Sequence, residues 1–204
     1  MEKEKKQSHS SVYSRLKGER TTNPLSSFMV SPAVKFETQT EGEKVLLLLR
    51  QHPVTNLGWG LVSLVMLFVP AFWELLPSGL LPTKFWWVGV ALWYIMVALF
   101  MVEKFLDWYF NVYIVTDERV VDIDFYGLVY RDMSVAQLSK LEDVNFKQTG
   151  GVAAMFDYGN VFLQTAGEQR EFDFAKVPHP SRVVEIIYEL IQEEEQEGHE
   201  GRVA

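Results

Sequence analysis

The sequence predicts an α+β membrane protein with two parts: a two-helix transmembrane hairpin, followed by an antiparallel β-sandwich or barrel with a C-terminal amphipathic helix. Three observations lead to this fold class. Apolar residues concentrate between Val54 and Val102, in stretches long enough to cross a bilayer. Short segments in which apolar and polar residues alternate begin at Val112. The last periodic segment, which starts at Pro180, has the spacing of an amphipathic helix.

Residues 1–43 form a polar, basic tail ahead of the apolar region. They are rich in Ser, Thr, Lys and Gln, and Pro24 and Pro32 interrupt any helical pattern, so we expect disorder. Up to Phe36 the tail has seven basic and three acidic residues, which suits an anionic inner leaflet. The next segment, residues 44–53, is a juxtamembrane lead-in, too short to cross a bilayer and expected to pack on the domain or lie at the interface.

Two apolar stretches, residues 54–76 and 85–106, are predicted to be transmembrane helices. A helix as long as the first rises about 34 Å, which matches a hydrocarbon core of about 30 Å. Aromatic residues gather at both ends of the hairpin, as in the interfacial belts of membrane proteins. They are Trp73, Phe85, Trp86 and Trp87 at the outer end, and Trp108 and Tyr109 at the inner end.

The distribution of charge predicts the topology. Lys44, Arg50 and the basic tail precede the first span and Lys104 follows the second, whereas the short outer loop, residues 77–84, has Lys84 as its only base. The positive-inside bias therefore places both termini in the cytoplasm, with a cell membrane crossed twice. The charge-free interiors of the spans argue against ion or proton transport.

Residues 107–192 are predicted to form the β domain. In its second expected strand, Val121 and Ile123 fall on one face, and Asp122 and Asp124 fall on the other, which we expect to be exposed. Turn-forming residues separate the strands. The expected strands are residues 112–116, 120–125, 128–135, 143–149, 160–165 and 170–174.

A helix is expected to end the domain. Pro180 suits its first turn. Between the strands, Leu138 and Leu141 are expected to anchor a loop in the core, and residues 193–204 are expected to be a disordered acidic tail. The apolar stripe of the helix consists of Val183, Ile186, Ile187, Leu190 and Ile191.

Several segments together resemble a known family. They are NVYIVTDERVVDID (111–124), LSKLEDV (138–144), FDYGNVFLQTAG (156–167) and VPHPSRVVEII (177–187), with GEKVLLLLRQHP (42–53) as a lead-in. Over about Gly42 to Ile191 the chain looks like the YdbS-like bacterial pleckstrin-homology (PH) domain family. The resemblance implies a PH-like fold placed after a pair of membrane helices, and it implies very little chemistry.

The sharpest polar cluster is the expected turn with Thr116, Asp117 and Arg119. As a binding site, it would hold a lipid headgroup or a peptide between two strands. As a structural element, Asp117 would bond the turn backbone and Arg119 would pair with a nearby acid. The structural interpretation is favoured, because a headgroup needs several bases and this hairpin offers one arginine beside two acids.

Phe156 and Tyr158 belong to a second candidate loop. It is either a recognition loop with exposed aromatic residues or a tight turn, with both rings in the core and Gly159 at positive φ. The turn is the favoured interpretation.

Composition excludes several function classes. The chain has no cysteine, and its four histidines never occur at metal-ligand spacing. No set of acids, serines or histidines resembles a catalytic site, so we expect no enzyme activity, no cofactor and no metal. From Asp107 to Glu197, eighteen acids against seven bases argue against a nucleic-acid partner.

The predicted function is therefore a non-enzymatic, membrane-anchored cytoplasmic interaction module. Residues 54–106 would contact the lipid bilayer, and the domain would bind an unknown protein partner or form a homo-oligomer at the inner leaflet. The alternative is an accessory subunit of a transporter or envelope-stress system that acts through its transmembrane helices.

Overall fold

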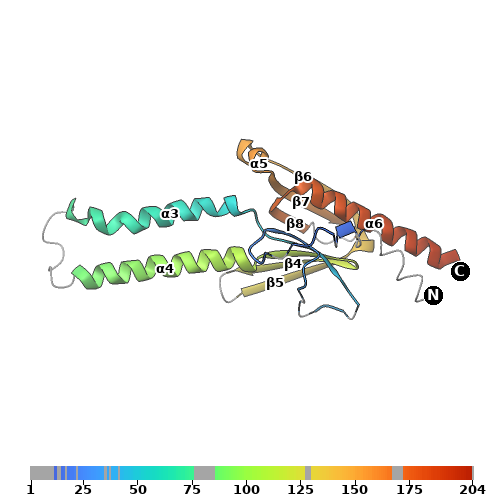
Figure 1. Ribbon diagram of the computed structural model, residues 1–204, viewed down its shortest axis with the longest axis horizontal. Coiled ribbons are helices and arrows are strands. Elements are labelled where there is room, and N and C mark those ends of the chain that lie inside the picture. Colours follow the sequence, from blue (N-terminus) through green and yellow to red (C-terminus); the bar gives the residue numbers. More distant parts are fainter. Residues whose placement is uncertain are drawn as a thin grey trace.

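The computed structural model describes residues 12, 15–16, 18–21, 23–34, 36, 38–40, 42–75, 86–126, 130–166 and 172–203. The predicted outer loop, residues 77–84, lies outside this part of the chain, as do residues 1–11 and the predicted turn residues Gly127 and Gly167. The described elements form a pair of apolar helices and, at one end of it, a domain of two antiparallel sheets and a long helix (Figure 1). The chain is thus an α+β protein.

The first sheet has five strands in the order β1-β2-β3-β4-β5, and the second has three in the order β6-β7-β8. The strands are β1 (Phe28–Val30), β2 (Val45–Leu49), β3 (Val112–Thr116), β4 (Arg119–Tyr126), β5 (Tyr130–Gln137), β6 (Leu141–Lys147), β7 (Tyr158–Thr165) and β8 (Phe172–Pro178). The helices are α3 (Leu57–Phe68), α4 (Trp86–Phe110), α5 (Gly151–Met155) and α6 (Pro180–Val203), with short 3₁₀ helices η1 (Pro53–Asn56), η2 (Val69–Leu75) and η4 (Leu138–Lys140).

The apolar hairpin, which we define as η1, α3, η2 and α4, is inserted into the first sheet between two strands that pair with each other. β2 precedes the hairpin and β3 follows it, and Leu49 lies opposite Tyr113 in their antiparallel ladder. The sheet domain therefore takes strands from both sides of the hairpin, whereas the sequence placed it wholly within residues 107–192. Residues 44–53 supply β2, because a continuous apolar run suits a strand that is buried on both faces.

The N-terminal tail also differs from the prediction where the structure describes it. Phe28–Val30 forms β1 and pairs with β2, and Val12 and Leu16 are buried in the main core. A segment this polar gains enough burial only against an apolar surface that the rest of the chain provides. At the other end, α6 continues through the predicted acidic tail to Val203.

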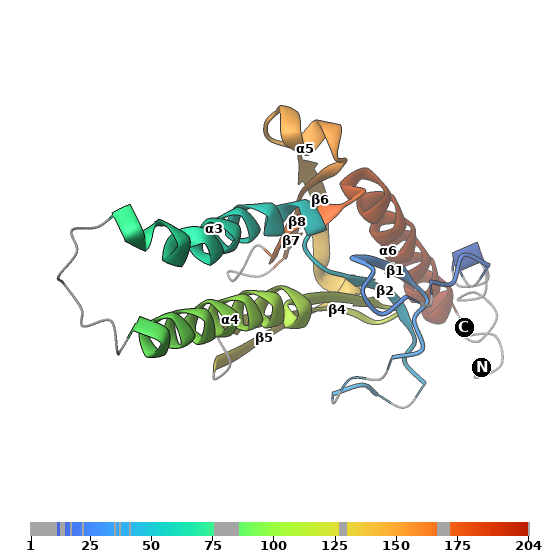
Figure 2. The ribbon, with the colours of Figure 1, turned by 60° about the vertical axis from the view of Figure 1, so that its left-hand side comes forward.

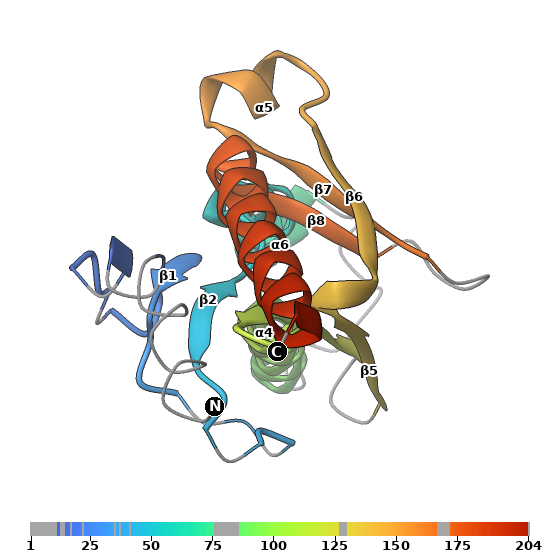
Figure 3. The same cartoon turned by 90° about the vertical axis from the view of Figure 1, so that its right-hand side faces the viewer.

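Two apolar clusters hold the domain together. The larger one lies between the two sheets and α6, and it includes Leu138, Leu141 and the predicted apolar stripe of α6, all buried. The smaller one lies on the opposite face of the first sheet, where Val121 and Ile123 pack with residues from β1, β2 and β3. The first sheet is consequently apolar on both faces. In Figure 3, α6 crosses in front of the second sheet, which it covers.

The two long helical stretches, Pro53–Phe72 and Trp86–Phe110, are long and apolar enough to cross a membrane, and 6% of each apolar window is buried. Among the described residues of α3 and α4, Ser63 and Val97 are buried, and the Tyr94 hydroxyl of α4 donates to the carbonyl of Leu67 on α3 at 3.3 Å. Gly58, Gly60 and Gly89 do not mediate helix contact, since among the described residues no atom lies within 4 Å of a Cβ built there.

Pro70 explains how the first helix of the hairpin ends. Proline has no backbone N–H, so it cannot donate to the carbonyl of Met66 as a helical residue would. The chain tightens into η2 at Val69, and the indole N–H of Trp93 on α4 donates to the Met66 carbonyl at 2.9 Å. The Met66 carbonyl thus accepts two hydrogen bonds, this one from Trp93 and a 3₁₀-type bond from the backbone N–H of Val69.

Candidate functional site

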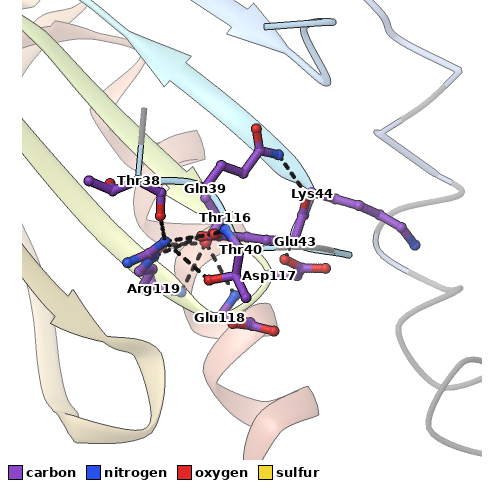
Figure 4. Close-up of polar contacts among 9 residues, drawn as sticks. All are labelled: Thr38, Gln39, Thr40, Glu43, Lys44, Thr116, Asp117, Glu118 and Arg119. Atoms are coloured by element: carbon purple, nitrogen blue, oxygen red, sulfur yellow. Dashed lines mark hydrogen bonds and ion pairs between the residues drawn. The ribbon is translucent and has the colours of Figure 1, made fainter. Parts of the chain in front are cut away.

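Thr116 closes the turn between β3 and β4, at the end of the sheet away from the hairpin. Figure 4 shows the polar contacts of this turn. Its buried hydroxyl accepts hydrogen bonds from the backbone N–H groups of Glu118 and Arg119, at 3.3 and 3.0 Å, and donates to the carbonyl of Arg119 at 2.9 Å. A side-chain hydroxyl that bonds the backbone two and three residues on is typical of a structural turn. The hydroxyl is therefore occupied by the turn itself.

Asp117 joins this turn to the beginning of β2. Its carboxylate accepts the backbone N–H of Lys44 at 2.8 Å, and its own N–H donates to the carbonyl of Lys44 at 3.2 Å. The sequence suggested that Asp117 bonds the backbone of its own turn. The structure instead directs this carboxylate to a residue far away along the chain, which fixes β2 beside the β3–β4 turn.

Arg119 pairs with Glu43, the acid that the sequence left unidentified. Two parallel bonds join them, from Nε to Oε1 at 2.9 Å and from Nη2 to Oε2 at 2.8 Å. The guanidinium also donates to the carbonyl of Thr38 and lies 5.6 Å from the ring centre of Phe36. A two-pronged pair of this kind is among the stronger charge-assisted contacts in proteins.

Glu43 is buried, with 5% of its surface exposed. Burial raises the pKa of its carboxyl, but the hydrogen bonds from Arg119 and from the backbone N–H of Thr40 outweigh this effect and lower the pKa overall. The carboxylate is thus charged and matched by Arg119. Together these contacts support a structural role for Thr116, Asp117 and Arg119; their role in binding stays a prediction.

Phe156 and Tyr158 lie in a different place, around His52 just before the hairpin begins. The Tyr158 ring stacks on the His52 ring at 5.5 Å between centres, and Phe156 lies 6.4 Å from it. β3 starts directly after α4, so Thr116 at its far end lies about 15 Å along the strand from the base of the hairpin. The structure therefore separates the two candidate loops to opposite ends of the domain.

The second loop is a turn, but not in the predicted way. The residue at positive φ is Asp157, at 50°, and its carboxylate contacts Nδ1 of His179 at 2.6 Å. Gly159 is needed for another reason: a Cβ there would lie 2.8 Å from the carbonyl of Lys147. Tyr158 is half-buried and Phe156 is exposed, so the predicted burial of both rings in the core was wrong.

Sequence reasoning missed the junction between the hairpin and the sheet, which centres on Arg50. This side chain is buried; it donates from Nε to the carbonyl of Tyr109 at 2.9 Å and from Nη1 to the carbonyls of Pro24 and Ser26 at 3.0 and 3.1 Å. Its guanidinium also lies 4.6 Å from the ring centre of Tyr109. Arg50 therefore ties the end of β2 to the base of α4 and to the segment before β1.

A second bond strengthens the junction. The indole of Trp108 on α4 donates to the carbonyl of Gln51 at 2.8 Å. An arginine that directly follows an apolar run was the available signal, but it has this meaning only when the run is known to be a strand.

Asp122 and Asp124 are not on an exposed face, as the sequence suggested. They share the face of β4 that carries Val120, which belongs to the core between the sheets, and both are half-buried. Burial, together with the charges of Asp124, Asp132 and Asp173, raises the pKa of Asp122 to about 7. One carboxylate oxygen of Asp122 is buried without a hydrogen-bond partner among the described residues.

These acids do not make a metal centre. Within the described ranges, no group of three or more histidine, aspartate or glutamate side chains is arranged to hold a metal ion.

Comparison with known proteins identifies the family. The sequence model described as "Bacterial PH domain" matches residues 55–191, about two thirds of the chain. The search of curated proteins and the search of solved structures give no match. Two antiparallel sheets followed by a C-terminal helix agree with the fold that this family name implies, and PH domains are in general interaction modules without catalytic activity. The chain belongs to the bacterial PH domain family.

Proposed function

We propose that this protein is a membrane-anchored interaction module whose PH-like domain lies against the cytoplasmic face of the cell membrane. One observation carries the proposal: two membrane-length apolar helices with almost no buried surface leave the sheet between paired strands β2 and β3. So much exposed apolar surface is stable only in lipid or against other apolar helices. The domain is then held at the bilayer surface by construction.

The junction supports a fixed orientation of the domain. α4 ends at Phe110 and β3 begins at Val112, so one residue separates helix from sheet. Arg50 and Trp108 bond across the same boundary. A domain joined in this way cannot swing freely on a linker, and it presents the same surfaces to any partner in or near the membrane.

The partner that fits best is a protein, including a second copy of this chain. The Arg119 turn, where a headgroup was considered, is occupied by Glu43, and the domain as a whole is acidic, which disfavours anionic headgroups and nucleic acids. β1 and β5 are the edge strands of the five-stranded sheet, and an edge strand accepts an added strand through its backbone.

The test uses the intact protein in its native membrane. Membranes are washed with alkaline carbonate and floated on a density gradient, and an external protease is then applied to sealed, inside-out and right-side-out vesicles. We expect the protein to float with lipid and the sheet domain to be cut only in inside-out vesicles. A protein that stays in the wash fraction contradicts anchoring, and cleavage in right-side-out vesicles contradicts the orientation.

A second function, that of an accessory subunit recognised through its helices, is supported by the glycine positions. Gly58, Gly60 and Gly89 point away from the contact within the hairpin and leave room for another helix. Replacing α3 and α4 by an unrelated hairpin of equal length separates the two functions. Crosslinking to the same partners after the exchange supports the domain as the recognition element, and its loss supports the helices.

A further inference from the structure

The short helix α5 presents an apolar face that the domain does not cover. Val152, Met155 and Phe156 are spaced as i, i+3 and i+4, so they lie on one side of a helical turn. Met155 is 81% exposed and Val152 is 55% exposed, whereas Ala153 on the opposite side is buried. From Gln148 to Phe156 the sequence contains no charged residue. Such a cluster of exposed large apolar side chains on a short loop is unusual for a surface in water.

The position of α5 relates it to the hairpin. Phe156, which follows α5 directly, lies 6.4 Å from the ring of His52, and His52 is the residue before η1 and the first apolar helix. Figures 1 and 2 both show α5 on the side of the domain from which the helices leave, level with the beginning of α3. In Figure 3, the view along the hairpin, α5 stands off to one side of the helix pair.

We propose that the apolar face of α5 inserts into the lipid interface beside the hairpin, as a third point of membrane contact. The inference rests on the proposed function, because it takes the bilayer surface to lie where the hairpin leaves the sheet. At that level, Val152, Met155 and Phe156 reach the boundary between headgroups and acyl chains, where apolar and aromatic side chains are stable. Lys147, at the end of β6, is exposed next to this loop and suits the headgroup region.

Insertion would settle how the domain sits on the membrane. The domain is fixed to the hairpin, but hairpin and domain together can still tilt in the bilayer, and a membrane contact to one side removes this freedom. The driving force is apolar, since the domain is acidic and gains little from anionic lipid. The second sheet, which carries α5 between β6 and β7, is then held close to the leaflet.

The test exploits the absence of cysteine from the chain. Single-cysteine variants of the full-length protein, M155C, V65C and S139C, are labelled with a small fluorophore and reconstituted in vesicles of phosphatidylcholine and phosphatidylglycerol. Val65 is exposed on α3 and reports on the bilayer core, and Ser139 is exposed in η4 at the far end of the domain. Quenching is measured with lipids that carry a quencher either near the headgroup or near the end of the acyl chain.

We expect the label at residue 155 to be quenched by the shallow quencher at least about twofold more than the label at residue 139, and residue 65 to be quenched by the deep one. The double change V152D and F156D is introduced into both M155C and V65C. It should remove the shallow quenching of the label at residue 155 and leave the deep quenching of the label at residue 65 unchanged.

Three results overturn the inference, and they are distinguishable. Equal quenching at residues 155 and 139, with residue 65 deep in lipid, refutes insertion of α5 and leaves the anchor intact. Loss of deep quenching at residue 65 refutes the anchor and the inference together. Protection of residue 155 from aqueous iodide that disappears when the protein is diluted in lipid shows that another copy covers α5.

Discussion

The two ends of the first sheet differ in how the negative charge of buried carboxylates is balanced. At the end away from the hairpin, Glu43 is buried, but Arg119 matches it with two bonds. At the end next to the hairpin, Asp122 and Asp124 are half-buried and Asp132 lies opposite Asp124 in the ladder. Among the described residues, none of these three aspartates forms an ion pair. The same strand, β4, thus begins in a matched pair and ends in unmatched negative charge.

This difference shows that conspicuous polar residues in a sequence can be bonded to one another, whereas inconspicuous ones can lie in an unusual environment. A turn with a threonine, an aspartate and an arginine attracts attention because it is polar, yet its groups bond one another and the backbone. The aspartates of β4 look like ordinary surface residues because they alternate with apolar ones. Their environment is unusual only because a second sheet lies over the same face.

The largest expected effect comes from breaking the matched pair with Arg119→Ala. This change leaves the Glu43 carboxylate buried without its partner, and we expect the free energy of unfolding to fall by about 3 kcal/mol. The measurement is denaturant unfolding of the full-length protein in detergent micelles. Arg182→Ala, which removes an exposed pair with Glu19, is the matched control and should cost less than about 1 kcal/mol. Equal losses in the two variants contradict the distinction between buried and exposed pairs.

The next effect concerns the cation at the hairpin end of the sheet, Arg50. Lysine keeps the charge of arginine but cannot direct planar N–H groups at three carbonyls, so Arg50→Lys should lower the free energy of unfolding by about 2 kcal/mol. Hydrogen exchange should also rise at the backbone of β3 next to Asn111, where helix meets sheet. Arg20→Lys, at an exposed position, is the control and should change neither quantity. An unchanged exchange rate in Arg50→Lys means that the junction does not depend on this side chain.

Much of the fold could be predicted from the sequence, because local pattern decides it. The two long apolar helices, the β3–β4 hairpin and the apolar stripe of α6 follow from hydrophobic period and turn chemistry, and strand β3 has the predicted bounds, residues 112–116. The boundary of the domain could not be predicted this way. Whether Val45–Leu49 is a lead-in or a central strand depends on β3, which comes some sixty residues later in the chain, and no local signal carries that pairing.

The candidate sites show the same limit. Arg119 was expected to pair with an acid, but its partner is 76 residues away in sequence. Phe156 and Tyr158 were grouped with no knowledge that His52 lies beside them. In each case the residue type indicated the kind of contact, but the sequence did not identify the partner. Residues so far apart in sequence are brought together by the topology of the sheets.

A smaller effect is expected at Asp122, where the negative charge is not balanced. Removing this charge should raise the free energy of unfolding, whereas the two changes above lower it. The pKa of Asp122 is raised from 3.8 to about 7, so the folded state binds this proton more tightly than the unfolded state does. The stability that this proton contributes is fully present below about pH 4 and is lost as the pH rises through 7. Asp122→Asn should therefore stabilise the protein by roughly 1–2 kcal/mol at pH 8 and change little at pH 4. Unfolding at several pH values measures it; a loss of stability at pH 8 would show that the carboxylate has a favourable partner.

The smallest effect tests whether the exposed carboxylate of Asp132 adds to the repulsion between the half-buried carboxylates of Asp122 and Asp124. Asp132 is exposed and lies directly across from Asp124, and like charges in that position repel each other. Asp132→Lys should replace this repulsion by attraction and stabilise the protein by about 0.5 kcal/mol, with a gain that shrinks at high salt because the pair is solvated. The same change should lower the pKa of Asp122, since Asp132 is one of the charges that raise it. A pH dependence of stability that moves to lower pH in Asp132→Lys therefore links the rim to the buried carboxylate. If the dependence stays where it is, burial and the charges of Asp124 and Asp173 account for the raised pKa of Asp122, and Asp132 acts independently of it.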